Sequence, residues 1–194
     1  MEKTLVHNKT FRKETDTAFL REGTVCDGCT FDRCTVAGRH LNGIVLLDCR
    51  FDGCDFSLSS LAGTVTDGVA FSGCKMTGVA FGERSGTCRL SASFAECILD
   101  NALFQYLEAP RSMFRHCRMR GTVFDRCMMK ETLFEMCDMH EASFSDCDLT
   151  GTDFLTSDGF TLDPETNRLR GARFAVASLP GLLAKYRIKT EEYP

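Results

Sequence analysis

The chain has 194 residues, of which 43% are hydrophobic, and a formal net charge of −4 at pH 7. This length suits one sizeable domain, and no run approaches the roughly 18 apolar residues of a membrane span. The polar start, residues 1–9, has no apolar segment before a cleavage site, so we expect no secretion signal and a cytoplasmic location. The mild charge neither predicts nor excludes a nucleic-acid partner.

The first 25 residues are weakly patterned. Val6 and Phe11 fit a five-residue frame that becomes regular further along the chain. Asp16 and Arg21 would be buried in that frame. We therefore interpret residues 1–25 as an irregular cap over the end of the fold, because exposed edge strands invite aggregation.

Beyond this cap, one central side chain recurs at every fifth position in two blocks. The first block is Phe31, Val36, Leu41, Leu46, Phe51, Phe56, Leu61, Thr66, Phe71, Met76 and Phe81. The second block is Phe94, Leu99, Phe104, Ala109, Phe114, Met119, Phe124, Met129, Phe134, Met139, Phe144, Leu149 and Phe154.

Neither a helix, with period 3.6, nor a strand, with period 2, keeps a five-residue pattern on one buried surface. A backbone that turns a corner every five residues does so, and four such sides close a coil of about 20 residues. The pattern predicts an all-β fold, a right-handed quadrilateral β-solenoid, over residues 26–178. Roughly eight coils would stand about 38 Å tall at a strand spacing of about 4.8 Å.

The two blocks are separated by an insertion. Phe81 and Phe94 are 13 residues apart, so residues 82–90 contain three residues beyond whole repeats. We expect a short surface loop, which either carries a binding function or is a bulge without one. The predicted loop residues are Glu83, Arg84, Ser85 and Gly86.

Twelve cysteines would suggest a disulfide scaffold in a short secreted chain, but the repeat accounts for ten of them. These ten stand two residues before a central side chain, where a small inward residue is needed. Their spacings of five and ten place them on different sides of a coil, so we expect reduced thiols and no metal site. They are Cys29, Cys34, Cys49, Cys54, Cys74, Cys97, Cys117, Cys127, Cys137 and Cys147.

The C-terminal end closes the pattern. Phe154 and Phe174 are one coil apart, although residues 158–167 break the composition rule. Residues 178–187 predict a short helix with Ser178 as its N-cap. The apolar side chains of this tail are Leu179, Leu182, Leu183, Tyr186 and Ile188.

The small–polar–bulky–polar–polar unit over residues 25–179 resembles the pentapeptide-repeat family. The tail, FTLDPETNRLRGARF followed by LPGLLAKYRIK, is similar to the C-terminal end of quinolone-resistance (Qnr-type) members. This resemblance implies that residues 179–194 form a two-fold homodimer. It also implies binding to the type II topoisomerases DNA gyrase and topoisomerase IV.

Charge is unevenly distributed. Ten acidic residues and no Lys or Arg lie between Glu131 and Glu165, over a predicted rise of about 8 Å. The same height of B-DNA carries about five phosphate charges, so this band predicts a DNA-mimicking surface.

Seven opposite-sign pairs at a spacing of 20 give an alternative, in which stacked ion pairs neutralise much of the band. These pairs are Asp100–Arg120, Arg111–Glu131, Arg115–Glu135, Arg118–Asp138, Arg126–Asp146, Asp148–Arg168 and Asp153–Arg173. Four acids lack a basic partner at that spacing. With Asp138 and Asp146 added, the predicted partner-binding surface is Asp138, Glu141, Asp146, Asp158, Asp163 and Glu165.

No motif for chemistry stands out. The histidines, His7, His40, His116 and His140, are scattered, and no phosphate loop, nucleophile elbow or paired-carboxylate motif is present. We expect no enzyme, no cofactor and no small-molecule substrate. The hypothesis is a non-catalytic protein that mimics DNA, binds a topoisomerase without contacting nucleic acid or membrane, and protects it from quinolones. The alternative is a generic interaction scaffold with a different partner.

Overall fold

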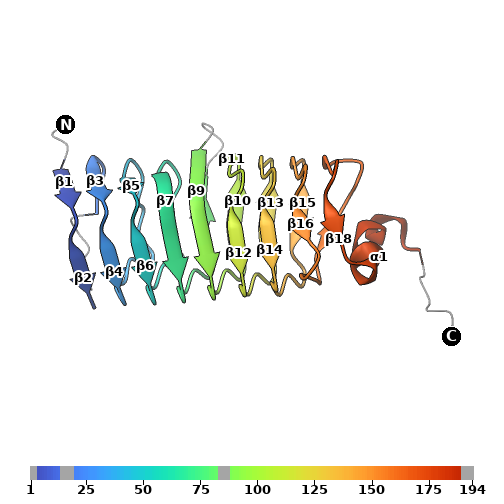
Figure 1. The fold of residues 1–194 in the computed structure, drawn as a ribbon, viewed down its shortest axis with the longest axis horizontal. Coiled ribbons are helices and arrows are strands. Elements are labelled where there is room, and N and C mark those ends of the chain that lie inside the picture. The colour runs from blue at the N-terminus through green and yellow to red at the C-terminus, as the bar shows by residue number, and fades with distance from the viewer. Residues whose placement is uncertain (1–3, 14–19, 83–87, 189–194) are drawn as a thin grey trace.

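The computed structural model describes residues 4–13, 20–82 and 88–188. It is a β-solenoid of about eight turns with a short helical tail, which confirms the predicted fold. Figure 1 shows the strands side by side along the long axis, with the tail at the far end. No helix among the described residues is long and apolar enough to cross a membrane.

Each coil has four sides, numbered here in chain order. Side 1 holds β1 (Thr4–His7), β3 (Thr24–Asp27), β5 (Val45–Leu47) and β11 (Leu107–Glu108). Side 2 holds β2 (Thr10–Arg12), β4 (Thr30–Asp32), β6 (Arg50–Asp52), β12 (Met113–Arg115), β14 (Leu133–Glu135), β16 (Asp153–Phe154) and β18 (Arg173–Phe174). Two eight-residue strands, β7 (Val65–Ser72) and β9 (Cys88–Ala95), run through both sides and join them into one 13-stranded sheet.

The other two sides are built differently. Side 3 is held by isolated parallel bridges, such as Arg118 with Asp138 and Asp138 with Asp158. Side 4 is a five-stranded parallel sheet. Its strands are β8 (Ala80–Phe81), β10 (Leu103–Gln105), β13 (Val123–Asp125), β15 (Ser143–Ser145) and β17 (Thr161–Leu162).

The core consists of stacked phenylalanines. On side 2, Phe94, Phe114 and Phe134 stack with ring centroids 4.8 and 4.9 Å apart and nearly parallel planes. A second column on side 4 meets the first edge-to-face, as Phe124 does with Phe134. Both arrangements are favourable for aromatic rings. The five-residue pattern therefore does what the sequence predicts, since every fifth side chain points inward.

The small inward residues also act as hydrogen-bond donors. The thiol of Cys54 donates to the carbonyl oxygen of Phe31 at 3.2 Å, 23 residues earlier. Thr122 donates in the same way to Leu99 at 2.8 Å. The position therefore favours Cys, Thr or Ser over Ala, because the hydroxyl or thiol satisfies a buried carbonyl of the preceding coil.

The N-terminal segment is more regular than predicted. Strands β1 and β2 pair with β3 and β4 at the full 20-residue spacing, so among the described residues the solenoid extends back from Cys26 to Thr4. Leu20 is buried and Arg21 is exposed. The inward position is therefore shifted by one residue from the five-residue frame, and the arginine stays at the surface. The prediction for Asp16 lies outside the described residues.

The insertion after side 4 leaves the later coils in register. Phe71 pairs with Phe94, 23 residues on, as the spacing predicts. The register changes between Thr66 and Val69 within the β7–β9 pair, so the extra length is absorbed before side 2. The predicted loop residues, Glu83, Arg84, Ser85 and Gly86, lie outside the described residues.

Residues 158–167, which depart from the repeat composition, are tied into the solenoid by the buried side-chain amide of Asn167. Phe160 and Leu162 are buried in place of regularly spaced central residues. Asn167 occupies the small inward position: its side chain accepts from the Cys147 N–H at 2.9 Å and donates to the Phe144 carbonyl at 3.0 Å. The next strand then returns to register, with Phe154 paired to Phe174.

The tail is a succession of short helical turns, and not the single helix predicted. These are η1 (Val176–Ser178), α1 (Leu179–Leu182) and η2 (Ala184–Tyr186). Ser178 occupies the N-cap of α1, but its side chain makes no capping hydrogen bond. Its hydroxyl donates instead to the Ser157 carbonyl at 3.5 Å, which fixes the tail to the last complete coil.

Candidate acidic interaction surface

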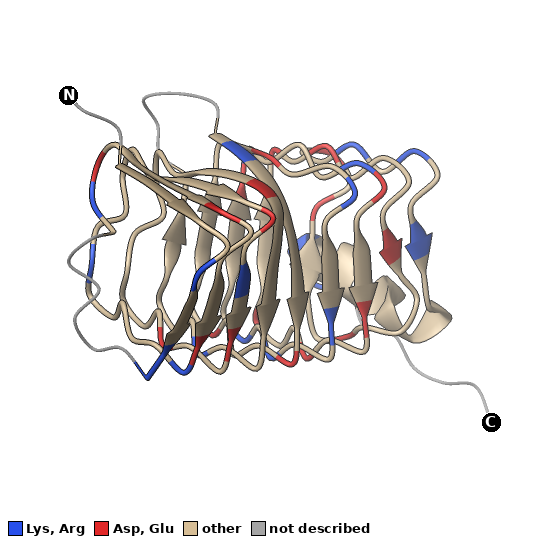
Figure 2. Cartoon of the chain, turned by 60° about the vertical axis from the view of Figure 1, so that its left-hand side comes forward, with Lys and Arg blue, Asp and Glu red and all other residues tan. Residues whose placement is uncertain are grey.

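Charged side chains of neighbouring coils pair along the outside of the solenoid, and Figure 2 shows positive and negative segments side by side. Five of the seven predicted pairs are present. Their N–O distances run from 2.8 to 3.9 Å: Arg111–Glu131, Arg115–Glu135, Arg126–Asp146, Arg168–Asp148 and Arg173–Asp153. Most of these side chains are well exposed, so each pair is expected to contribute only about 0.2–1 kcal/mol.

The other two predicted pairs, Asp100–Arg120 and Arg118–Asp138, are wrong, because the two arginines exchange their acidic partners. Arg118 binds Asp100 at 2.7 Å, and Arg120 binds Asp138 at 2.6 Å. Arg118 forms an isolated bridge on side 3 and Arg120 is in the turn that follows; both are exposed, and their long side chains reach diagonally across the coils. Partial burial acts to raise the pKa of Asp138, but hydrogen bonds with His140 and Arg120 hold it below its usual value.

A lysine in the tail pairs with two acids that the sequence left without a partner. Lys185 Nζ lies 2.7 Å from Asp163 and 2.5 Å from Glu165, and the Tyr186 hydroxyl donates to Glu165 at 2.6 Å. We call these four residues the tail clasp. Partial desolvation acts to lower the pKa of Lys185, but the two carboxylates raise it above its usual value.

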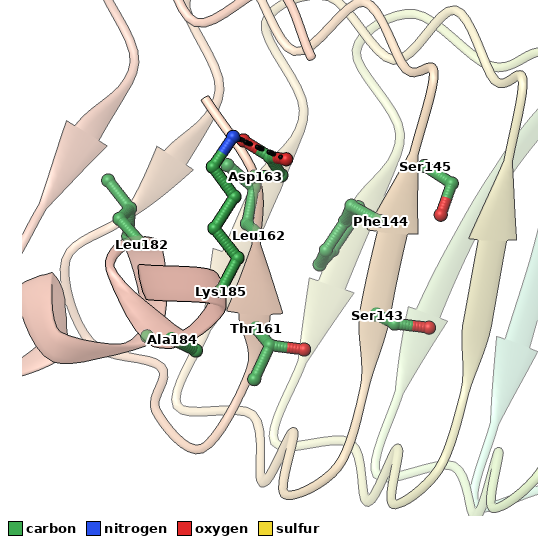
Figure 3. Close-up of a pocket in the computed structure, with 10 residues that line it drawn as sticks. Ser143, Phe144, Ser145, Thr161, Leu162, Asp163, Leu182, Ala184 and Lys185 are labelled. Carbon is green, nitrogen blue, oxygen red and sulfur yellow. Dashed lines mark hydrogen bonds and ion pairs between the residues drawn. The ribbon is translucent and has the colours of Figure 1, made fainter. Parts of the chain in front are cut away.

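The clasp closes one end of a hollow between side 4 and the tail. The hollow has a volume of about 270 Å³, and its floor carries the small side chains Ser143 and Ser145. Figure 3 shows Lys185 reaching over Leu162 toward Asp163, with Leu182 beside it. The tail is therefore held against the solenoid by both apolar packing and charge.

Two acids of the predicted surface remain without an ion pair in the part of the chain that the structure describes. Glu141 and Asp158 are exposed, and neither lies near enough to a cation for a salt bridge. Asp158 lies on side 3, where its backbone forms an isolated β-bridge with Asp138 in the preceding coil, and Glu141 stands at the corner that follows side 3. The six predicted residues are thus divided: Asp138, Asp158 and Glu141 lie on or next to side 3, Asp163 and Glu165 belong to the tail clasp, and Asp146 pairs with Arg126 at the corner after side 4.

The tail presents an apolar surface. Leu179, Leu183, Tyr186 and Ile188 are between 37 and 58% exposed. Leu182 differs, because it packs against the core of the same chain. Val176, at 83% exposed, belongs to the same tail and was not predicted, because it precedes the apparent helix.

The cysteines occupy the predicted inward positions, but six of them are stacked in one column between sides 2 and 3. These are Cys34, Cys54, Cys74, Cys97, Cys117 and Cys137, all free and buried. Burial raises the thiol pKa elsewhere in the core, to about 12 at Cys26 and about 11 at Cys49. In the described ranges, no group of three or more His, Cys, Asp or Glu is placed to hold a metal ion.

The histidines stay apart from one another. His140 lies 2.6 Å from Asp138, and His7 lies 3.2 Å from Asp27. Both rings are more than half exposed, so these are surface contacts with a neighbouring carboxylate. His40 and His116 are exposed on other coils.

Comparison with known proteins agrees with the repeat geometry. Residues 90–159 match the family model described as a pentapeptide repeat region. These residues therefore form a pentapeptide-repeat region. No curated protein sequence matches it at a significant level.

Several solved structures are similar to this chain over most of its length. Full-length QnrB1, a plasmid-mediated fluoroquinolone resistance protein, is 18% identical, with 95% of this chain and 100% of that chain covered and a TM-score of 0.47. HetL, a pentapeptide-repeat protein from the cyanobacterium Nostoc sp. strain PCC 7120, is 11% identical, with 91% and 86% covered and a TM-score of 0.44. Because these similarities are low, the fold assignment rests on the repeat itself and on the family match.

Proposed function

We propose that this protein is a non-catalytic DNA mimic that binds DNA gyrase or topoisomerase IV in the cytoplasm and protects the enzyme from quinolones. The observation that carries the proposal is the acidic C-terminal end of side 3. Glu141 and Asp158 project there without a salt bridge in the described part of the chain, next to Asp138. A cationic DNA-binding groove binds regularly spaced negative charges. Carboxylates held in place on a rigid solenoid can provide such charges.

The dimensions support the same proposal. Eight coils at a spacing of about 4.8 Å stand about 38 Å tall. Two copies joined at their tails would approach twice that length, comparable with about 20 base pairs of B-DNA. Residues on side 3 of the last coils would then lie on both flanks of the two-fold axis.

A dimer through the tail is part of this proposal. The exposed apolar residues Leu179, Leu183, Tyr186 and Ile188 lie beyond the last coil, where a second copy can reach them. The resemblance of the tail to that of Qnr-type proteins supports the assignment. Truncation after Phe174 should give a monomer in sedimentation. A truncated chain that stays dimeric would show that the dimer forms elsewhere.

One observation favours the second candidate function, an interaction scaffold with a different partner. Eight of the ten acids between Glu131 and Glu165 lie within 4.0 Å of a Lys or Arg. Paired charges weaken the external field, so this surface is less anionic than its composition indicates. The topoisomerase proposal therefore depends on the unpaired carboxylates.

The deciding experiment is DNA supercoiling by purified gyrase in the presence of a fluoroquinolone, with increasing amounts of this protein. We expect supercoiling to recover. The double variant Glu141→Lys/Asp158→Lys should need at least about tenfold more protein for the same recovery, because charge reversal repels a cationic groove.

The matched control is Asp52→Lys/Glu96→Lys, which makes the same charge change at two exposed acids on side 2 of earlier coils. It should protect as the wild type does. If the wild type neither restores supercoiling nor inhibits gyrase without drug, the topoisomerase proposal is wrong and the scaffold function stands. If both double variants lose protection equally, net charge and not this surface is responsible.

A further inference from the structure

The outward face of side 1 in the first four coils carries a column of aliphatic side chains. Leu5, Val25, Val45 and Val65 are direct neighbours in β1, β3, β5 and β7. Leu5 is 69% and Val65 52% exposed, and the two valines between them are half-buried. Threonine has a similar preference for strands, so β propensity alone does not require four aliphatic residues here.

Acidic residues flank this column on one side. The next outward column, two residues further along each strand, is His7, Asp27, Leu47 and Asp67. Asp48 stands at the following corner, exposed. Among the described residues, Asp48 and Asp67 have no ion pair, and Asp27 pairs only with His7. No Lys or Arg occupies an outward position of these four strands on side 1.

The charge of the same coils changes around the corner. Side 2 carries exposed Arg12, Lys13, Arg33 and Arg50. Side 2 also carries Asp32, which pairs with Arg33, and the exposed Asp52, so both signs of charge occur there, whereas side 1 of these coils carries acids without Lys or Arg. The acidic character of side 1 is therefore a local property of this face and does not follow from the overall composition.

The spacing of the aliphatic column fits a helix laid along the solenoid axis. Neighbouring strands are about 4.8 Å apart, so the column is about 14 Å long. One helical turn rises about 5.4 Å, which is within about 0.6 Å of the coil spacing. An extended peptide repeats its side chains about every 6.8 Å and would lose register at the second coil.

We propose that side 1 of the first four coils is a docking surface for a basic amphipathic helix of another protein. Apolar side chains on successive turns of that helix would cover the aliphatic column, and flanking Lys or Arg would pair with Asp27, Asp48 and Asp67. This surface lies at the opposite end of the solenoid from the acidic residues assigned to topoisomerase binding. The two proposals therefore stand or fall separately.

The probe is a synthetic amphipathic peptide of about 14 residues, long enough for a marginally stable helix, with Leu on one face and Lys on the other. It is titrated into the ¹⁵N-labelled full-length protein, and backbone resonances are followed. We expect the largest shifts in β1, β3, β5 and the first half of β7. A peptide with Glu in place of every Lys should not bind.

Two double variants separate the contribution of charge from that of apolar contact. Asp48→Lys/Asp67→Lys should weaken binding at least about tenfold, because it turns attraction into repulsion. Leu5→Ser/Val65→Ser should also weaken it, because less apolar surface is covered. The control Asp52→Lys/Glu96→Lys, with the same charge change on side 2, should leave affinity within about twofold. All six positions are exposed, so the fold should persist, which circular dichroism verifies.

Three results would overturn the proposal. The first is the absence of binding at millimolar peptide. The second is binding whose resonance shifts map to side 3 or to the tail. The third is an equal loss of affinity in Asp48→Lys/Asp67→Lys and in the control Asp52→Lys/Glu96→Lys. Binding would then depend on the net charge of the protein and not on side 1.

Discussion

Phe124 is the clearest position at which to test how the core is stabilised. It is fully buried, stacks between Phe104 and Phe144 at 4.8 and 4.6 Å, and meets Phe114 and Phe134 edge-to-face. Replacement by alanine removes one ring from the middle of the side 4 column and two edge-to-face contacts with the side 2 column. The neighbouring coils cannot close the gap, because the hydrogen bonds of the sheet fix their separation.

The magnitude follows from this burial. A buried Phe→Ala change typically costs about 3–5 kcal/mol, and four aromatic neighbours place Phe124→Ala at the upper end, about 5 kcal/mol. Phe174, in the last coil, is only half-buried, stacks on Phe154 at 5.2 Å and has one further, tilted ring contact with Phe160 at 6.1 Å. Phe174→Ala should therefore cost about 2 kcal/mol. With a urea m-value of about 2 kcal/mol/M, the two midpoints should differ by more than about 1 M.

The assay is urea unfolding followed by far-UV circular dichroism, with both variants at one protein concentration because association would add to the apparent stability. Unchanged m-values would show that both variants unfold the same cooperative unit. Equal costs at the two positions would refute the reasoning. They would mean that contacts between neighbouring coils contribute little beyond the burial of each ring.

Three further predictions concern the tail and the inward polar residues. Lys185→Gln should speed amide hydrogen exchange in residues 179–186, because the tail clasp loses its cation. In the wild type, the pKa values of the clasp carboxylates are lowered, so their contribution is present above their ordinary pKa near 4 and should be lost as the pH falls below it. Unchanged exchange in the variant would show that packing alone holds the tail. Thr122→Val should cost about 1 kcal/mol in urea unfolding, because the Leu99 carbonyl loses one of two hydrogen-bond donors, and a neutral result would remove the donor role of the inward position. Under brief iodoacetamide treatment, mass spectrometry should find Cys88 modified first, because it is the only cysteine that is not fully buried, and early modification of a core cysteine would show that the coils open.

The five-residue period was sufficient to predict the fold, because it can be checked residue by residue. The 23-residue interval between Phe71 and Phe94 and the 20-residue interval between Phe154 and Phe174 both correspond to paired strands. The period could not place the N-terminal start. A one-residue shift at Leu20 brings an apolar side chain inward, and a fixed frame cannot anticipate such a shift.

The ion pairs were only partly predictable, for a geometric reason. Counting 20 residues locates the strand above but not the direction in which a long side chain leans. Arg120 therefore reaches Asp138, which the sequence had paired with Arg118. Lys185 escaped prediction altogether, because it lies beyond the repeat, where no period relates it to Asp163.

The cysteines show a similar limit of counting along the chain. Spacings of five and ten separate neighbouring thiols onto different sides, as predicted. Intervals of 20 and 23 then superimpose six of them, from Cys34 to Cys137, in one column. Such stacking can be predicted only when the number of residues in every coil is known, including the 23-residue coil between Phe71 and Phe94.

The hydrogen bonds from inward residues to the preceding coil have a consequence for how the protein is made. Cys54 reaches back to Phe31, and Cys147 reaches back to Phe124, in each case 23 residues. Each of these bonds thus needs only chain that has already been synthesised, and none of them waits for a downstream segment. A nascent chain can therefore wind onto its own first strands while the ribosome is still translating, with partners that are always close in sequence. The tail, synthesised last, is then added to a solenoid that is already complete.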